Sequence, residues 1–279
     1  MIQTATQLKA LIRNKSKGNS ATAQTLIRSY FMERFLERVS LSEYKNSFVL
    51  KGGLLISSIV GLDTRSTMDI DGSIKNMPLT LETVKDMVEK IIAMPLEDNT
   101  SFSIKKIEPI MEEADYGGIR ISLDAQVDNM QTPLKIDIST GDVITPRETA
   151  YHFKLMFEER SIPILAYNLE TLLSEKLETV IRRGELNTRL RDFYDIAILV
   201  NGIRPIQQDT FRQAFKATTE NRGTVPLLEN GELILQEVRT SATMQSLWQN
   251  YQRKFTHAKD FTWETVMDSV DKLYIMAME

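Results

Sequence analysis

The chain has 279 residues, 42% hydrophobic and 26% charged, with a formal net charge of −4. This composition excludes wholesale disorder and a generic cationic coat for nucleic acid, while leaving room for a local basic patch. With no cysteine and only two histidines, a disulfide framework, a thiol nucleophile and a Cys- or His-rich metal site are excluded. Asp and Glu remain as ligands, and they suit Mg²⁺ or Mn²⁺.

No apolar run approaches the length that spans a bilayer, and residues 1–19 lack the apolar core of a signal peptide. We therefore expect a soluble, cytoplasmic protein without a membrane partner.

The first half of the chain predicts alternating helices and strands. Helical spacing of apolar residues indicates helices over 20–39, 54–60 and 81–93, and alternation indicates strands over 48–50, 68–74, 118–127 and 134–139. Residues 128–133 join the last two strands, so an antiparallel hairpin is the simplest pairing. Gly141, Pro146 and Pro163 are interpreted as marking the exit from the sheet.

From Asn168 onward the pattern is helical. Helices are predicted over 169–183, 188–200, 210–219, 231–239, 244–255 and 263–276. The aromatic residues near the C-terminus, Phe255 among them, are interpreted as core and not as a base-stacking platform. The pattern predicts an α+β part over residues 1–150 and an all-helical part over 151–279.

Three aspartates have the spacing of a metal site. Asp69 and Asp71 lie two apart on a predicted strand and point to one side, while Ile70 points to the core. Asp137 is the polar residue of another strand. If the strands are neighbours, the carboxylates can hold two divalent cations, activate a 3′-hydroxyl and bind a triphosphate. The alternative is that each is a solvent-facing strand residue, and for Asp137 alone this alternative is favoured.

Lys176 falls inside an apolar helical stripe, whereas Glu175 lies off it. An ammonium there must extend to solvent, pair with a carboxylate, or meet an anion such as an NTP phosphate. The alternative is an ion pair with an aspartate of the other part of the chain. The stripe consists of Leu169, Leu172, Leu173, Val180 and Ile181.

Four arginines, residues 182, 183, 189 and 191, form a local basic cluster that can contact triphosphate or RNA backbone. The alternative is a solvated corner between helices. Asp192 and Asp195 lie one turn apart, so they can orient an arginine, bind metal, act as a general base, or simply begin a helix.

These segments resemble the AbiEii/AbiGii-type nucleotidyltransferase toxins of bacterial abortive-infection and toxin–antitoxin systems, within the DNA polymerase β-like superfamily. The resemblance extends from the helix containing Phe31–Leu36 to about Val200. Its strongest pieces are FVLKGGLLISSIVGLDTRSTMDID, LKIDIST and YNLETLLSEKLETVIRRGELNTRLRDFYDI, in that order. It implies a polymerase-β-like core, a small mixed sheet with flanking helices, followed by a helical lobe that contributes Lys176 and Asp192 to the cleft.

The resemblance also implies roles for single residues. Gly52 and Gly53 match the turn that cradles phosphate. The carboxylates of Asp69, Asp71 and Asp137 match the metal ligands. Lys176 matches a nucleotide-binding lysine, and Asp192 matches the aspartate of an Arg-Asp motif, a proposed catalytic base. The expected substrate-binding residues are Lys51, Gly52, Gly53, Ser57, Arg65, Arg189 and Arg191.

One position departs from the family pattern. Many members have Ser or Thr directly after the glycines, where this chain has Leu54. The hydroxyl contact to phosphate is then lost, or it comes from Ser57 or Ser58.

The resemblance implies a transferase that moves NMP from Mg-NTP to an acceptor such as tRNA and arrests growth during phage attack, restrained by a cognate antitoxin. Two alternatives use the same residues. One is a metal-dependent nuclease or phosphohydrolase, and the other is a catalytically silent protein that binds NTP or a partner.

Overall fold

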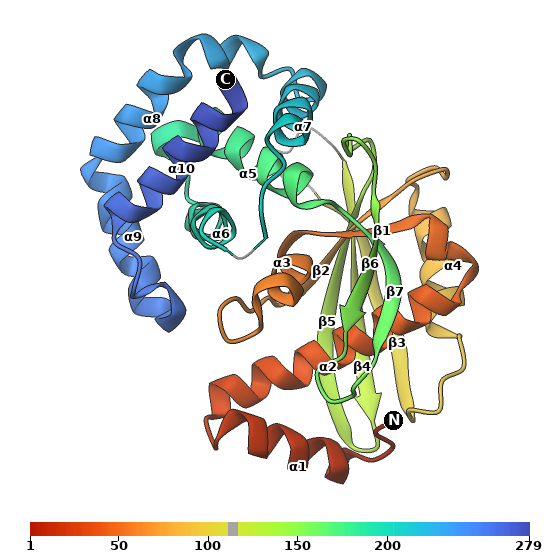
Figure 1. Ribbon diagram of the computed structural model, residues 1–279. Coiled ribbons are helices and arrows are strands. Elements are labelled where there is room, and N and C mark those ends of the chain that lie inside the picture. The colour runs from red at the N-terminus through yellow and green to blue at the C-terminus, as the bar shows by residue number, and fades with distance from the viewer. Residues whose placement is uncertain (111–116, 203) are drawn as a thin grey trace. The chain divides into compact units, whose positions relative to one another are not determined.

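The computed structural model describes residues 1–110, 117–202 and 204–279. The chain divides into two compact units (Figure 1). Unit 1 comprises residues 1–62, 66–141 and 149–166, and unit 2 comprises residues 63–65, 142–148 and 167–279. The chain therefore passes between the units after residues 62, 65, 141, 148 and 166, whereas the sequence placed a single division at residue 150.

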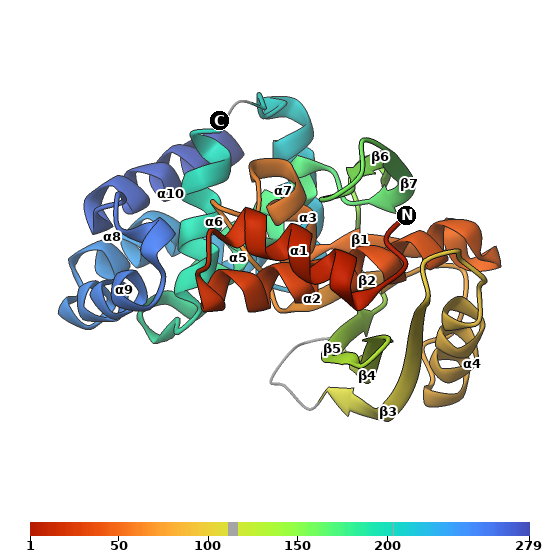
Figure 2. The same ribbon diagram turned by 90° about the horizontal axis from the view of Figure 1, so that it is seen from below.

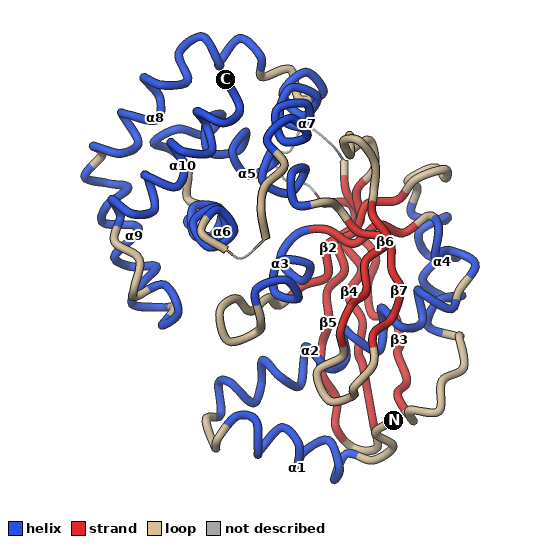
Figure 3. Tube along the Cα trace, viewed as in Figure 1, coloured by secondary structure: helices blue, strands red, loops and turns tan. Residues whose placement is uncertain are grey.

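Unit 1 holds every strand that the structure describes, together with four α-helices (Figure 3). The strands are β1 (Phe48–Lys51), β2 (Asp69–Ile74), β3 (Thr100–Ile110), β4 (Gly118–Val127), β5 (Met130–Ser139), β6 (Thr149–Lys154) and β7 (Ser161–Ala166). The helices are α1 (Ala5–Ser16), α2 (Ser20–Leu41), α3 (Gly52–Val60) and α4 (Leu81–Ile92). Figure 2 shows α1 beside α2, which it contacts.

The seven strands of the described residues form one mixed sheet in the order β3-β4-β5-β2-β1-β7-β6. β2 runs parallel to β5 and β1 parallel to β7, and the other neighbours are antiparallel. One face carries fully buried isoleucines such as Ile70, Ile121 and Ile136. Helix α2 packs against β5 and β7, and α4 packs against β3 and α2. The sheet therefore has an apolar core side, and the intervening residues of β2, β4 and β5 point to the other side.

The regular secondary structure that the structure describes in unit 2 is helical. Its α-helices are α5 (Leu169–Arg183), α6 (Leu190–Val200), α7 (Gln208–Asn221), α8 (Gly231–Thr240), α9 (Ala242–Lys254) and α10 (Trp263–Met278). Helix α5 contacts α6 and α7, and α10 contacts α6 and α7. Their shared core includes the fully buried Phe193, Phe211 and Leu273.

The predicted α+β class, with a mixed sheet, flanking helices and a helical C-terminal part, is confirmed. The sheet is larger than expected, because β3, β6 and β7 were not predicted. In β3 the register shifts between Ile104 and Lys106, which breaks the alternation of apolar residues. In β7 the alternation is intact, but Pro163 was interpreted as ending the sheet, and that interpretation was wrong.

Three prolines are tolerated within strands of this sheet. At the position of each proline, its strand pairs with a neighbouring strand on one side only. Pro163 lies outside the two residues of β7 that pair with β1. Pro133 lies before the part of β5 that pairs with β2, and Pro109 lies in the edge strand β3. A proline there removes no ladder hydrogen bond from its open side. Because Pro133 lies within β5, the β4–β5 hairpin has a two-residue turn at Asp128 and Asn129, not the predicted six-residue connection.

No helix among the described residues is long and apolar enough to cross a lipid bilayer.

Candidate active site

A row of charged residues crosses the polar face of the sheet in unit 1. Strand register places Lys51 of β1 opposite Asp71 of β2, Asp71 beside Asp137 of β5, and Asp137 opposite Arg120 of β4. Directly opposed residues point to the same side of a sheet. Asp69 lies two residues before Asp71 and shares its face. The structure thus brings the three predicted carboxylates onto one face of two adjacent strands.

The glycine turn lies directly beside this row. Helix α3 begins at Gly52, immediately after β1, and the backbone N–H of Gly53 donates to Asp71 Oδ2 at 3.1 Å. Gly52 has a φ of +64°, a conformation that favours glycine. The first N–H groups of a helix have no acceptor within the helix, and they suit an anion. The glycine turn and the aspartates are therefore in direct contact, through the hydrogen bond from Gly53 to Asp71.

Burial dominates the electrostatics of Asp71 and raises the pKa of its carboxyl group. The Gly53 N–H and the Lys51 ammonium lower the pKa, whereas the carboxylates of Asp137 and Asp69 raise it further. Like charges gathered in a partly buried site require a compensating cation. Lys51 and Arg120 supply part of this compensation from the protein itself.

The oxygen donors of Asp69 and Asp71 fit Mg²⁺ or Mn²⁺, which prefer carboxylates. No three carboxylate or imidazole side chains of the described residues lie close enough together to hold a metal ion as they stand. Asp137 instead makes two hydrogen bonds with Arg120, from Nε at 2.8 Å and from a terminal nitrogen at 2.6 Å. Asp137 is therefore already neutralised by a protein cation.

Sequence reasoning missed Arg120. It lies between Ile119 and Ile121, so alternation alone places it on the polar face. Its partner depends on the register of the hairpin. With a two-residue turn, Val127 opposes Met130 and Arg120 opposes Asp137. A predicted connection of six residues obscured this pairing.

Lys176 lies in unit 2, where it joins two carboxylates of helix α6. Its Nζ lies 2.7 Å from Asp192 Oδ1 and 2.7 Å from Asp195 Oδ2. Burial lowers the pKa of Lys176, but the two carboxylates outweigh it and raise the pKa above its ordinary value. The ammonium is therefore charged over the whole physiological range. Of the predicted options, pairing with a carboxylate is the one observed, within the same unit.

Arg65 enters the same cluster from the three-residue segment 63–65. Its Nε donates to Asp195 Oδ1 at 2.8 Å and a terminal nitrogen donates to Asp195 Oδ2 at 3.2 Å. Both side chains are buried. Asp195 thus orients an arginine, one of the roles that its spacing from Asp192 suggested, and Arg65 is held by a protein carboxylate.

The predicted basic residues of α6 differ in their surroundings. Arg191 holds its guanidinium over the ring of Phe255, 5.6 Å from the centroid, and Lys254 Nζ lies 5.4 Å from the same centroid. Arg189 is exposed. Phe255 is only partly buried, so it is not simply the core residue that the sequence predicted.

The two serines that follow Leu54 are placed differently. Ser57 is buried in α3. Ser58 Oγ donates to the carbonyl of Leu55 and lies 3.0 Å from the hydroxyl oxygen of Tyr151. Both serines lie beyond the first turn of α3, where Gly52 and Gly53 are found.

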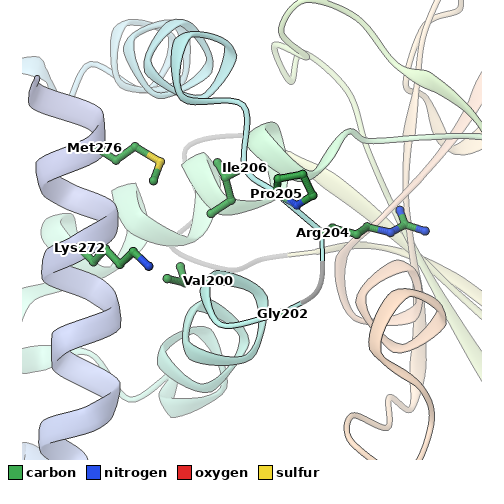
Figure 4. Close-up of a pocket in the computed structure, with 7 residues that line it drawn as sticks. All are labelled: Val200, Gly202, Arg204, Pro205, Ile206, Lys272 and Met276. Atoms are coloured by element: carbon green, nitrogen blue, oxygen red, sulfur yellow. The ribbon is translucent and has the colours of Figure 1, made fainter.

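A pocket of about 360 Å³ lies elsewhere in unit 2, lined by Val200, Gly202, Arg204, Pro205, Ile206, Lys272 and Met276 (Figure 4). None of the predicted site residues lines it. Apolar side chains and Lys272 line it, whereas the side chain of Arg204 points away from them in Figure 4. The pocket and the Lys176 cluster share no residue.

The sequence matches the profile of a protein family described as nucleotidyl transferase AbiEii toxin, type IV toxin–antitoxin system, over residues 34–269. The match includes every predicted site residue. No curated protein is significantly similar to the chain.

Several solved structures resemble the chain at low sequence identity. A candidate nucleotidyltransferase from Helicobacter pylori has a TM-score of 0.48 at 14% identity, with 91% of this chain and 96% of that chain covered. JHP933 from Helicobacter pylori has a TM-score of 0.49 at 13% identity, with coverages of 91% and 94%. An antigenic nucleotidyltransferase-like protein from Paracoccidioides brasiliensis has a TM-score of 0.39 at 12% identity, with coverages of 88% and 92%.

Proposed function

Because the chain belongs to the AbiEii nucleotidyl transferase toxin family of type IV toxin–antitoxin systems, we propose that it transfers NMP from a metal-bound NTP to an RNA acceptor. The family makes the chain a nucleotidyltransferase and implies an NTP substrate and an antitoxin. The metal, the acceptor and the residue roles are the content of the proposal.

The observation that carries the proposal is the position of Asp71. It lies beside Asp137 in the sheet and accepts a hydrogen bond from Gly53 at the start of α3. A site for Mg-NTP needs carboxylates for the ion and N–H donors for the phosphates, and this is where the chain offers both. We assign Asp69 and Asp71 as metal ligands and Asp137, which binds Arg120 in this structure, as a third ligand.

When bound, the divalent ion would neutralise triphosphate charge and favour the ionised acceptor hydroxyl. The acceptor 3′-oxygen forms a bond to the α-phosphorus, and the bond from that phosphorus to the pyrophosphate oxygen breaks. We assign Asp192 to take the hydroxyl proton and Lys176 to bind a phosphate oxygen. The charged state of Lys176 supports its role, and the 16% exposure of the Asp192 side chain supports access to a substrate.

RNA, with tRNA as its expected form, is the proposed acceptor. Arg189 and Arg191 supply positive charge at the start of α6 in a protein whose net charge is negative. Phe255, with Arg191 and Lys254 over its ring, combines an aromatic surface with cations. Bases stack on such aromatic groups while phosphates pair with the cations. We further propose that modification of RNA arrests growth during phage attack and that the antitoxin opposes it.

The decisive experiment incubates the protein with each α-labelled NTP, Mg²⁺ or Mn²⁺, and total cellular RNA. Wild type should label RNA, and Asp71→Asn should lose at least about 99% of the rate, since it removes a charged metal ligand. Asp86→Asn, an exposed aspartate of α4 in unit 1, is the matched control and should retain activity.

Each other outcome supports a different conclusion. Shortened RNA or free phosphate would indicate the nuclease or phosphohydrolase. A change in melting temperature with NTP but no product would indicate a silent nucleotide-binding protein. If no NTP labels RNA and wild type behaves as Asp71→Asn does, the transferase assignment is wrong. In cells, only wild type, and not the double variant Asp69→Ala/Asp71→Ala, should arrest growth.

The acceptor assignment has its own test. Arg191→Ala and Phe255→Ala should weaken binding of fluorescent single-stranded RNA by about 5- to 50-fold, because stacking and phosphate contacts are each worth roughly 1–3 kcal/mol. Lys216→Ala, an exposed cation of α7, should bind RNA as wild type does. Equal binding by all three variants would contradict RNA contact at this surface.

A further inference from the structure

Lys176 belongs to a four-residue ion cluster in unit 2 with an exposed side and a buried side. The side chains of Lys176 and Asp192 are 12% and 16% exposed, whereas those of Arg65 and Asp195 are 3% and 0% exposed. Asp195 links the two sides, because one of its oxygens binds Arg65 Nε and the other lies 2.7 Å from Lys176 Nζ. Only the outer pair can reach a substrate.

The cluster is balanced in charge. Two cations and two carboxylates sum to zero, which a buried site requires. Burial raises the pKa of Asp195, but Lys176 and Arg65 outweigh it and lower the pKa below its ordinary value. Removing Arg65 would leave the negative charge of Asp195 less compensated, so Asp195 would compete with an anionic ligand for Lys176. Removing Asp195 would leave the two cations of the cluster with Asp192 as its one remaining carboxylate.

Two consecutive residues of α6 hold the segment that carries Arg65. The hydroxyl of Tyr194 donates to the carbonyl of Thr64 at 2.8 Å, and Asp195 binds the guanidinium. Arg65 is itself buried. A residue fixed in this way supports its neighbours, and it does not suit a role as a mobile phosphate ligand.

We propose that Asp195 and Arg65 are positioning residues for Lys176: Asp195 fixes the ammonium from the buried side, and Arg65 offsets the charge of Asp195 so that the lysine stays available for a nucleotide phosphate. This proposal rests on the proposed function in assigning Lys176 to the nucleotide. It replaces the direct substrate contact expected for Arg65 with an indirect role.

A double-mutant cycle tests whether Asp195 acts through Lys176. Asp195→Asn should lower kcat/KM for NTP at least about 10-fold, and the same substitution in a Lys176→Ala background should change it less than about 2-fold, because residues that act as a unit are not additive. Arg65→Ala should also lower it, and Arg65→Lys should restore part of the loss. Full additivity of Asp195→Asn and Lys176→Ala would overturn the proposal.

The matched control lies on the same helix as Lys176. Glu178 is buried in α5 and binds Arg222 at 2.6 Å, so Glu178→Gln also breaks a buried ion pair. Its effect on melting temperature should resemble that of Asp195→Asn. Its effect on kcat/KM should be small and should be the same in the wild-type and Lys176→Ala backgrounds. If Glu178→Gln couples to Lys176 as strongly as Asp195→Asn does, the coupling is general loss of structure and the proposal is wrong.

A second measurement needs no catalytic activity, so it separates failure of this proposal from failure of the proposed function. Amine acylation at pH 8–9 followed by mass spectrometry reports how readily Lys176 loses its proton. Asp195→Asn should speed acylation about 3-fold or more by removing a stabilising charge, and Arg65→Ala should slow it by a similar factor by removing a repelling one. Acceleration in both variants would mean loosened packing and would overturn the proposal.

Discussion

At the scale of single residues, Gly52 is constrained in two independent ways. Its φ of +64° is strained for any residue with a side chain, and a Cβ atom there would overlap the carboxylate of Asp71. The first constraint acts on stability. The second acts on the position of a proposed metal ligand, because the carboxylate would have to move away from the turn.

We expect Gly52→Ala to lower the melting temperature and also to reduce nucleotide transfer at least about 100-fold, since displacing a ligand by about 1 Å has effects of this size. Gly61→Ala is the control. It shares a positive φ, +94°, but its Cβ would meet nothing within 4 Å, so it should lose stability and keep its activity. Thermal denaturation and the RNA-labelling assay measure both effects. Equal loss of activity in the two variants would contradict the explanation.

Arg120 competes with a cation for Asp137. Removing a positive charge next to a cation site strengthens cation binding by Coulomb attraction. We therefore predict that Arg120→Gln tightens Mn²⁺ binding by roughly 2- to 5-fold in calorimetric titration, and that Asp137→Asn weakens it. Weaker Mn²⁺ binding in Arg120→Gln would mean that Arg120 is needed to hold Asp137 in its ligand geometry.

At the scale of elements, helix α2 buries charged residues along its length. Glu33 and Glu37 are both 4% exposed. Glu33 accepts hydrogen bonds from the backbone N–H of Met156 at 3.0 and 3.1 Å, and Glu37 binds Arg160. These contacts attach the connection between β6 and β7 to α2.

Burial raises the pKa of Glu33 from 4.5 to about 8, although the Met156 N–H and Arg34 lower it. A carboxyl group with a raised pKa in the folded state contributes stability that is fully present below its unfolded pKa of 4.5 and is lost as the pH rises through 8. We predict that the free energy of unfolding falls by on the order of 3–5 kcal/mol between about pH 5 and pH 8.

Glu33→Gln tests this prediction, since the amide keeps an acceptor for the Met156 N–H and does not titrate. Urea denaturation of the variant should show a flatter dependence on pH over this range and greater stability than wild type at the alkaline end. Glu43→Gln, at an exposed position, is the control and should follow wild type. A pH dependence unchanged by Glu33→Gln would assign it to another group.

The elements that the sequence predicted are those with an uninterrupted period. Helix α5 and strand β4 were predicted with their observed bounds, since each carries an unbroken apolar pattern. The missed strands β3 and β7 have local features that obscure them, the register shift of β3 and Pro163 of β7. Whether a proline ends a strand depends on which neighbour the strand has, and that is a property of the sheet and not of the segment.

At the scale of the whole molecule, the residues of the candidate site could likewise be predicted only where a local sequence pattern marks them. Asp69, Asp71, Asp137 and Lys176 could be found from alternation and from the helical stripe, because these patterns are local. The pairing of Arg65 with Asp195 joins residues 130 apart in sequence. No local pattern specifies such a partner, and the resemblance alone assigned Arg65 to a substrate.

Unit 2 is built from three chain segments, so its C-terminal segment alone lacks residues that the unit contains in the intact chain. A fragment of residues 167–279 retains Lys176, Asp192 and Asp195 but lacks Arg65. It also lacks Thr145, whose carbonyl accepts a hydrogen bond from Asn168 and whose N–H donates to Thr171. The fragment therefore keeps two carboxylates and one ammonium in a cluster that is balanced in the intact chain.

We predict that Asp195→Asn has opposite effects on the intact chain and on this fragment. In the intact chain it removes the carboxylate that binds the buried Arg65 at 2.8 Å, which should cost about 3–5 kcal/mol of unfolding free energy. In the fragment it removes the surplus buried charge and should raise the melting temperature followed by circular dichroism. Asp192→Asn, on the exposed side, should change both proteins less. If Asp195→Asn lowers the melting temperature of the fragment as well, Asp195 stabilises unit 2 independently of Arg65, and segment 63–65 is not required for the charge balance of the cluster.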